Sequence, residues 1–368
     1  MANKAYKFRL YPTQEQEQFF IKSFGCVRLV YNKMLAERNE MYEKLKSNPV
    51  KLKNRKFPTP AKYKHDFPFL KEVDSLALAN AQINLQKAYK NFYDGHAHYP
   101  TFKSRKSKQS YTTNHVNGNI KLSEDHIKLP KLKPVKIKLH REIPSDHKIK
   151  SCTITRTKTG KYYISILTAY EKEMKPVEVT KVVGLDFAMN GLYVESEQGE
   201  KANYPRFYRQ KLSKLAKEQR VLARRKKGSA RFERQRLKVA KLQEKIANQR
   251  KNFLHHKSKE LTTFYDAVVI EDLNMKGMSQ AFRFGKSVHD NGWGMFTTFL
   301  DYKLKEQGKQ LIKINRWYPS TKKCSSCGTV NDILLSNRIY YCSCGYTADR
   351  DHNAAINIKN EGIRLLEV

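Results

Sequence analysis

The stretch Val183-Gly184-Leu185-Asp186-Phe187 decides the fold of the second half of the chain, because it is a short apolar strand that ends in a carboxylate. A similar stretch, Val268-Val269-Ile270-Glu271, follows a long charged helical region at residues 205–260. A helix around Phe296–Glu306 and a strand at Gln310–Ile314 come next. Strands that alternate with helices predict an α/β layer fold for this half.

Three acidic residues at the ends of these elements are the candidate catalytic residues. Asp186 and Glu271 end apolar strands, and Asp351 lies at a predicted helix start, in Asp349-Arg350-Asp351-His352-Asn353. Mg²⁺ prefers a few carboxylate ligands, and two such ions about 4 Å apart can activate water and stabilise a leaving oxygen. Each acid alone could be an ordinary cap or turn residue, but the three in this order favour a Mg²⁺ site that Mn²⁺ could also fill. Spacing alone does not choose between Asp349 and Asp351.

Four of the six cysteines fall in one short segment and form a candidate zinc site: Cys324, Cys327, Cys342 and Cys344. Paired thiolates brought together by a loop suit tetrahedral Zn²⁺, and four protein ligands make a structural site. Gly328 and Gly345 permit a tight backbone after each pair. The alternative is a set of reduced core cysteines, and the second pair, C-x-C, is shorter than the usual C-x-x-C. Cys26 and Cys152 lie far from this segment and are interpreted as structural.

The formal net charge of +37, from 72 Lys and Arg against 35 Asp and Glu, predicts a polyanionic partner. Contacts from Lys and Arg to phosphates release counterions. The helical region 205–260, with a break at Gly228-Ser229, is the candidate binding surface, because its acids are too sparse to neutralise it through i,i+4 pairs. Two antiparallel basic helices could lie along the backbone of a heteroduplex; otherwise the charge run is only a solvated face. The candidate contact residues are Arg220, Arg224, Arg225, Lys226, Lys227, Arg231, Arg234 and Arg236.

A second, weaker basic segment, Tyr99–Lys108, interleaves cations with aromatic residues. This composition suits phosphate contact combined with base stacking, and the candidate residues are Lys103, Arg105 and Lys106. The alternative is a disordered basic linker.

The first half of the chain combines a helical region with a small antiparallel β-unit. A strand at Ala5–Leu10 precedes Thr13 and Gln16, which form a capping-box signature, and helical periodicity follows. From Asn114 to Tyr170 the period switches to two, with a hairpin turn at Lys158–Lys161. The N-terminal strand could pair into this β-unit, which would make the helical region an insertion.

No apolar stretch is long enough to span a bilayer, and the N-terminus lacks the apolar core of a signal peptide. We therefore expect an intracellular protein with no membrane partner, cytoplasmic and associated with the nucleoid of a prokaryotic host. In a reducing compartment its cysteines would be thiols or metal ligands rather than disulfides.

Motifs across nearly the whole chain resemble those of the TnpB family, which comprises transposon-encoded, RNA-guided DNA endonucleases of the RuvC type related to type V CRISPR nucleases. Residues 184–187, 269–274 and 349–357 resemble the first, second and third RuvC motifs. The Ser320–Gly328 stretch is similar to the cysteine motif that the family inserts between the last two, and Tyr6–Pro12 and Trp293–Phe296 fit the family as well. The family pattern places the catalytic acid two residues before the asparagine, which implies Asp351.

This resemblance implies a multidomain α+β fold. An RNase H-like (RuvC) α/β nuclease domain, with an inserted zinc-binding loop, is accompanied by a small antiparallel β-barrel-like wedge domain that carries a helical recognition insertion. The implied ranges are 1–11 and 114–180 for the wedge, 12–113 for the recognition domain, 181–322 and 347–368 for the nuclease domain, and 323–346 for the zinc insertion. The resemblance also implies a guide RNA from the transposon end and a double-stranded DNA target, cut beside a short motif that the protein reads.

Three other functions are compatible with this pattern. An RNA-guided repressor would bind without cutting; loss of an acid would indicate it, and all three acids are present. A CRISPR-associated effector of the same fold would be flanked by a repeat array instead of a transposon end. A transposase proper would catalyse strand transfer.

Overall fold

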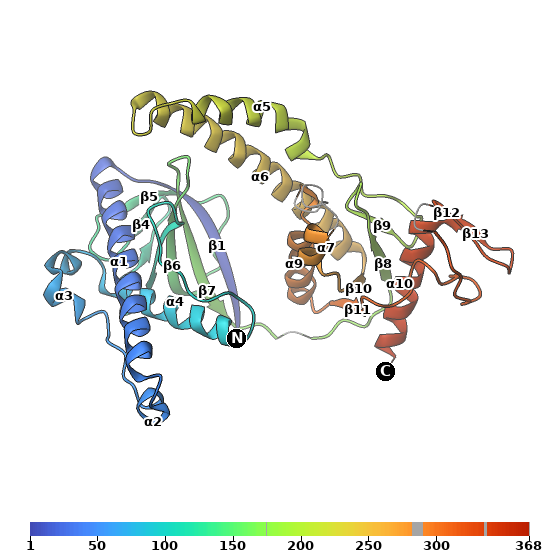
Figure 1. Cartoon of the computed structure of the whole chain (residues 1–368), viewed down its shortest axis with the longest axis horizontal. Coiled ribbons are helices and arrows are strands. Elements are labelled where there is room, and N and C mark those ends of the chain that lie inside the picture. Colours follow the sequence, from blue (N-terminus) through green and yellow to red (C-terminus); the bar gives the residue numbers. More distant parts are fainter. Residues whose placement is uncertain (174, 282–289, 335–336, 368) are drawn as a thin grey trace. The chain divides into compact units, whose positions relative to one another are not determined.

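The computed structural model describes residues 1–173, 175–281, 290–334 and 337–367, and the chain forms two compact units, residues 1–172 and 173–368 (Figure 1). Each unit combines a β-sheet with helices, so the expected multidomain α+β fold is confirmed. Within the segment 323–346, expected to bind zinc, residues 335 and 336 lie outside the described residues. In the part of the chain that is described, no helix has both the length and the apolar composition needed to cross a bilayer.

The first unit is built on a seven-stranded sheet with the order β2-β6-β7-β1-β5-β4-β3. Its strands are β1 Ala2–Tyr11, β2 Gln109–Asn114, β3 Lys121–Leu122, β4 His126–Lys128, β5 Val135–Lys138, β6 Lys148–Arg156 and β7 Tyr162–Tyr170. β1 pairs antiparallel with both β7 and β5. This pairing confirms that the N-terminal strand joins the β-unit and that the helical residues between β1 and β2 are an insertion.

The sheet differs from the expectation in two respects. β2 lies in the region 12–113 that was expected to be helical; its core-facing positions are Tyr111 and Thr113, so its sequence carries little period-two hydrophobic signal. β2 and β3 form the two edges of the sheet. Hydrogen bonding between the described strands therefore leaves the sheet open and does not close it into a barrel.

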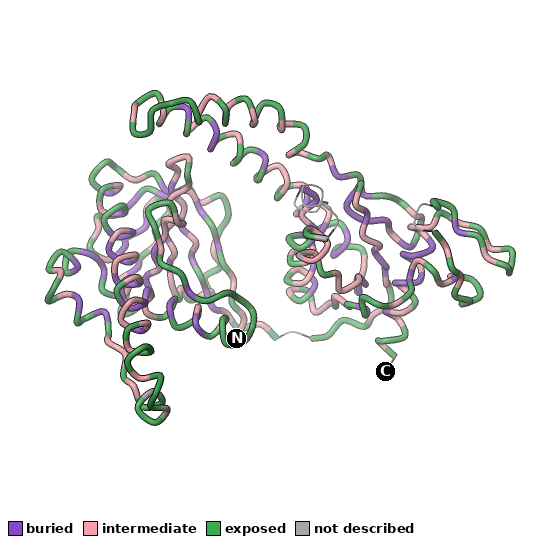
Figure 2. Tube along the Cα trace, in the orientation of Figure 1, coloured by how far each residue is buried: buried purple, intermediate pink, exposed green. Residues whose placement is uncertain are grey.

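The inserted helices share their core with this sheet. They are α1 Gln14–Leu45, α2 Pro49–Lys53, α3 Tyr63–Asp66, the 3-10 turn η1 Pro68–Glu72 and α4 Ser75–Tyr93. The predicted capping box begins α1, because the N–H of Thr13 donates to the side-chain oxygen of Gln16 over 3.0 Å and the N–H of Gln16 donates to the Thr13 hydroxyl. Apolar side chains of α1 and α4 are buried in one core with the inward residues of β1 and β7. Figure 2 colours the trace by burial and shows buried positions in these elements. Ile83 of α4 is exposed.

The second unit has a four-stranded sheet with the order β11-β10-β8-β9. Its strands are β8 Val182–Phe187, β9 Tyr193–Glu195, β10 Ala267–Glu271 and β11 Gln310–Ile314. β10 runs parallel to β8 and β11, whereas β9 is antiparallel to β8. The helices are α5 Phe207–Ala223, α6 Ala230–Phe264, α7 Met275–Ala281, α9 Trp293–Glu306 and α10 Arg350–Leu366.

Helices cover both faces of this second sheet. Leu185 and Ile270 are buried in a core with Leu254 of α6 and Phe296 of α9. Side chains alternate between faces along a strand, so the neighbouring residues of β8 and β10 point the other way, where α10 packs. Parallel strands buried on both faces read as continuous apolar runs, which is what the sequence shows here. The expected α/β layer fold is confirmed for this unit.

Two further elements extend from the second unit. α5 and α6 pack together as a helical hairpin, and the predicted break lies where expected: Gly228 has a left-handed φ of 84° and Ser229 caps α6. The antiparallel strands β12 Ile339–Tyr341 and β13 Thr347–Asp349 flank the second cysteine pair and lead directly into α10.

Candidate active site and metal centre

Asp186 and Glu271 lie at the carboxyl ends of two neighbouring strands, β8 and β10, of the second sheet. In the parallel pairing of β8 with β10, Leu185 is opposite Ile270, and each acid is the next residue of its strand. Adjacent strands are about 4.8 Å apart. Both acids follow residues that face α6 and α9, so they lie on the opposite face of the sheet, which α10 covers.

Two glycines allow α10 to lie directly on this face. A Cβ at Gly184 would meet the carbonyl oxygen of Ala355 and the backbone nitrogen of Lys359, and a Cβ at Gly362 would overlap the side chain of Val269. The close contact places the first turn of α10, with Asp351, beside the two strand ends. Neither glycine was predicted to have this role. For Gly362, a glycine inside an apolar helical pattern was the available signal.

The charges of the other two carboxylates act on Asp186. Burial raises the pKa of Asp186 well above its usual range, the charges of Glu271 and Asp351 raise it further, and Arg350 opposes them. Burial also raises the pKa of Glu271, against a 2.6 Å hydrogen bond that the Ser320 hydroxyl donates to its Oε1. A divalent cation would favour the ionised form of all three acids. The donor set therefore fits Mg²⁺, which takes oxygen ligands.

The two aspartates of the third motif occupy different positions. Asp349 is the N-cap of α10, and its Oδ1 accepts the N–H groups of Asp351 (2.9 Å) and His352 (3.0 Å). The Asp351 carboxylate is instead held by guanidinium groups: Oδ1 accepts from Arg350 over 2.7 Å and Oδ2 from Arg338 over 3.5 Å. Asp351 is the one whose charge acts on Asp186.

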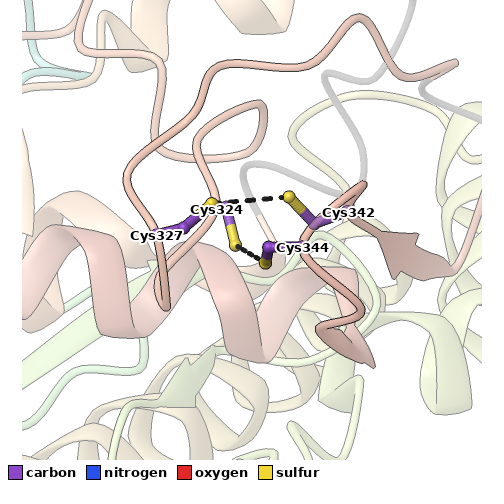
Figure 3. A group of neighbouring side chains, drawn as sticks. All are labelled: Cys324, Cys327, Cys342 and Cys344. Atoms are coloured by element: carbon purple, nitrogen blue, oxygen red, sulfur yellow. Dashed lines mark hydrogen bonds between the residues drawn. The ribbon is translucent and has the colours of Figure 1, made fainter.

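The four cysteines of the candidate zinc site lie together, with their sulfur atoms pointing toward one another (Figure 3). The Sγ–Sγ distance is 3.8 Å for Cys324 and Cys344 and 3.6 Å for Cys327 and Cys342, and all four atoms lie within 4.8 Å of one another. Four thiolates about 2.3 Å from a zinc ion would be about 3.8 Å apart. The short C-x-C pair thus reaches the same point as the C-x-x-C pair, and the spacing fits one zinc ion.

Hydrogen bonds at this site favour the thiolate of Cys342. A backbone hydrogen bond from Cys344 and the side chain of Asn331 lower the pKa of Cys342 to about 6, and the thiolate is the form that binds a metal. At Cys344 a backbone hydrogen bond from Tyr346 lowers the pKa, but the neighbouring thiols of Cys342 and Cys327 raise it, to about 12. Gly328 and Gly345 have φ values of 80° and 88°, as expected for the tight turns after each pair. Cys26 and Cys152 are buried in the core of the first unit.

Two buried asparagines of α10 connect the cysteine segment to the acidic residues. The side-chain amides of Asn353 and Asn357 both donate to the carbonyl oxygen of Lys323, over 2.8 and 2.6 Å. Asn357 also donates to the carbonyl oxygen of Ser320 over 2.8 Å, and the Ser320 hydroxyl holds Glu271. No structural role was predicted for Asn353 or Asn357 from the sequence. Two amides four residues apart in a helix, amid buried alanines, were the signal for a structural role.

Ten of the eleven candidate nucleic-acid contacts are exposed, as a binding surface requires. Those of the helical hairpin surround the turn between α5 and α6, and Arg236 also pairs with Glu233 over 2.7 Å. Lys103 is the exception. Its ammonium lies 3.8 Å from the centroid of the Tyr31 ring, burial lowers its pKa, and Asn32 holds its backbone N–H and carbonyl.

A second cationic surface, which was not predicted from the sequence, lies on the outer face of the first sheet. In β1, outward Lys7, Arg9 and Tyr11 alternate with buried apolar residues. Arg9 is opposite both Lys138 of β5 and Tyr163 of β7, and its guanidinium lies 5.1 Å from the Tyr163 ring. Cations that alternate with apolar residues along a strand were the signal, because an antiparallel sheet can have one face packed on the core and the other exposed to solvent.

These features define a class of basic α+β protein in which an acidic cluster and a four-cysteine site share one α/β unit. Family models match in three places: a probable transposase model (OrfB of IS605) over residues 165–281, a Cas12f1-like TNB domain over 293–358, and a helix-turn-helix domain over 1–47. The last description does not fit this chain, since its residues 2–45 form strand β1 and the single 32-residue helix α1.

Two relatives match nearly end to end. A Streptomyces pristinaespiralis protein named "Putative RNA-guided DNA endonuclease" is 34% identical over 98% of this chain and 89% of its own length. "Putative RNA-guided DNA endonuclease InsQ" of Escherichia coli K12 is 30% identical over 99% of this chain and 93% of its own. The chain belongs to this family, the TnpB family. A solved structure of a Cas12f1-sgRNA-target DNA complex covers 98% of this chain and 99% of that one with a TM-score of 0.61 at 13% identity, a likeness of fold alone.

Proposed function

We propose that this protein is an RNA-guided, Mg²⁺-dependent DNA endonuclease encoded by a transposable element, with a guide RNA from the transposon end. The observation that carries the proposal is the convergence of Asp186, Glu271 and Asp351 from two strand ends and one helix start. The relatives named as RNA-guided DNA endonucleases support the same activity.

In the proposed reaction the three carboxylates would hold Mg²⁺, and the bound ion would supply activation of water and stabilisation of the leaving oxygen of the phosphodiester. The remaining contacts keep the ligands in place. Ser320 orients Glu271, and Arg350 fixes the carboxylate of Asp351. Four closed cysteine ligands leave no open position for substrate, so zinc at that centre would be structural.

Guide pairing supplies sequence specificity in this proposal, and the protein reads the heteroduplex by its shape and a short motif beside the target. The exposed cations of the α5–α6 hairpin would contact phosphates. The outer face of β1, β5 and β7 adds cations and tyrosines that suit the backbone and bases of RNA.

The test begins with the RNA that copurifies with the full chain. Once it is sequenced, a matched duplex is incubated with the protein in Mg²⁺, and Asp186→Asn serves as the matched variant. We expect the wild type to cut and the variant to bind the same DNA without cutting. RNA that maps to a transposon end supports the proposal, whereas RNA built from repeats would indicate a CRISPR-associated effector. A wild type that binds but never cuts in Mg²⁺ or Mn²⁺ would indicate a repressor.

A further inference from the structure

The two tryptophans of the chain have opposite environments. Trp293 is buried, with its ring 5.3 Å from that of Phe187 and 5.5 Å from that of Phe296. Trp317 is 85% exposed. Tryptophan usually contributes its large apolar area to a core or an interface, so an almost fully exposed indole needs a reason outside the packing of this unit.

Trp317 lies in a loop that is fastened at both ends to the exit of β10. On one side, Arg316 pairs with Asp272 over 3.0 Å. On the other, the Ser320 hydroxyl donates to Glu271 over 2.6 Å. Glu271 and Asp272 are consecutive, so the loop is held against the acidic cluster itself.

The loop is also ordered internally. The N–H of Trp317 donates to the side chain of Asn315 over 2.9 Å, and the N–H of Tyr318 donates to the Asn315 carbonyl over 3.0 Å. Three residues of chain span at most about 11 Å, which bounds the distance from the Trp317 backbone to that of Ser320. An exposed aromatic side chain is thus presented from a fixed loop within a short reach of Glu271.

We propose that Trp317 is a stacking site for an unpaired nucleobase of the DNA strand being cut, which rests on the proposed function. Every base offers a π-face, so an indole can hold a strand at the acidic cluster without reading its sequence. The flanking cations suit the phosphates on either side of that base, because Lys313 and Arg316 both have exposed side chains next to the loop. The two cations attract the phosphate backbone of the strand, and the indole fixes the position of one base.

The test uses the zinc-loaded full chain and an oligothymidine of about ten nucleotides, within the range of single-strand site sizes. An abasic oligomer with the same phosphates is the matched ligand, because it can bind by charge but cannot stack. Oligothymidine should quench the fluorescence of Trp317, and the abasic oligomer should not. Trp317→Ala should weaken oligothymidine binding between about 5-fold and 150-fold, with most of the affinity restored in Trp317→Phe.

Phe264→Ala is the matched control variant. Phe264 is also strongly exposed, but it lies just before β10, at the opposite end of that strand from Glu271. This variant should bind oligothymidine as the wild type does. Equal affinity of Trp317→Ala and wild type for oligothymidine would overturn the inference. So would quenching by oligouridine without quenching by oligothymidine, since the site would then hold RNA.

Cleavage of the guide-matched duplex is measured separately. If the wild type cuts but shows no base-dependent quenching, the stacking site fails and the proposed function stands. If base-dependent quenching is present but the wild type never cuts, the stacking of single-stranded DNA stands and the proposed function fails.

Discussion

Asp349 and Asp351 are two residues apart, but their side chains have different contacts: Asp349 caps α10, whereas the Asp351 carboxylate is held by Arg350 and Arg338. We expect Asp351→Ala to reduce cleavage of a guide-matched duplex below detection, because one carboxylate of the proposed Mg²⁺ site is lost. Binding of the same duplex should persist, since affinity comes from backbone contacts and base pairing. A cleavage assay beside a gel shift measures both.

Asp349→Ala is the control for that variant. It removes the cap of α10 and should lower the free energy of unfolding by about 0.5–2 kcal/mol. It should retain substantial cleavage. If Asp349→Ala is inactive and Asp351→Ala still cuts, the choice between the two aspartates is wrong.

His255 connects stability to pH. Its ring stacks on Phe299 at 3.9 Å between centroids, and burial together with Lys303, Lys251 and His256 lowers its pKa from 6.5 to about 4. The unfolded chain therefore binds more protons between these values, so the stability contributed by neutral His255 is lost as pH falls from 6.5 toward 4. We expect His255→Phe, which can keep the stack, to make the free energy of unfolding depend less on pH between 4 and 6.5. His98→Phe, at an exposed histidine of the first unit that does not act on His255, should leave that pH dependence unchanged. Urea midpoints at several pH values measure the difference.

At the scale of elements, the contact between α10 and the sheet depends on Gly184. A Cβ there meets backbone atoms that cannot rotate away, so Gly184→Ala should cost about 1–3 kcal/mol of stability through overpacking. Gly294→Ala is the matched control, because nothing lies within 4 Å of its Cβ position at the start of α9. Alanine is the better helix former by up to about 1 kcal/mol. Thermal unfolding of the two variants should shift in opposite directions.

The cysteine segment between β11 and α10 makes a second prediction at this scale. Elemental analysis should find about one zinc ion per chain, and Cys324→Ser should lose it, because one of four closed ligands is gone. Cys26→Ala, a substitution in the core of the first unit, should keep its zinc. Equal zinc in wild type and Cys324→Ser would remove Cys324 from the ligand set.

Patterns within an element were readable from the sequence, and contacts between distant elements were not. The apolar runs of β8 and β10, the capping box of α1 and the break at Gly228 follow from local residue types, and each lies where predicted. β2 was missed because tertiary pairing with β6, not its own sequence, makes it a strand. The bond from Ser320 to Glu271 joins residues far apart in sequence, so no local signal predicts it.

At the scale of the whole molecule, a net charge of +37 makes binding to nucleic acid dependent on salt. Arg224, Arg225, Lys226 and Lys227 are all exposed at the turn of the α5–α6 hairpin. Replacing the four with Glu should weaken binding of RNA or heteroduplex broadly and reduce the slope of log K against log salt by about 3–4. Affinities measured across a salt series give that slope. Unchanged affinity and slope would mean that the hairpin turn is only a solvated surface.

The strand pairing of the second unit has a consequence for synthesis on the ribosome. β10 can pair with β8 only after the whole α5–α6 hairpin has been synthesised, because the hairpin lies between the two strands in the sequence. Asp351 is synthesised later still, with α10. Among the residues that the structure describes, the core of the first unit includes none beyond 172, and domains generally fold from the N-terminus as they are made. A nascent chain therefore displays the cationic face of β1, β5 and β7 while Asp186 and Glu271 still lack their third partner. On the proposed function, one part of the surface that binds nucleic acid is folded before the unit that cuts it is complete.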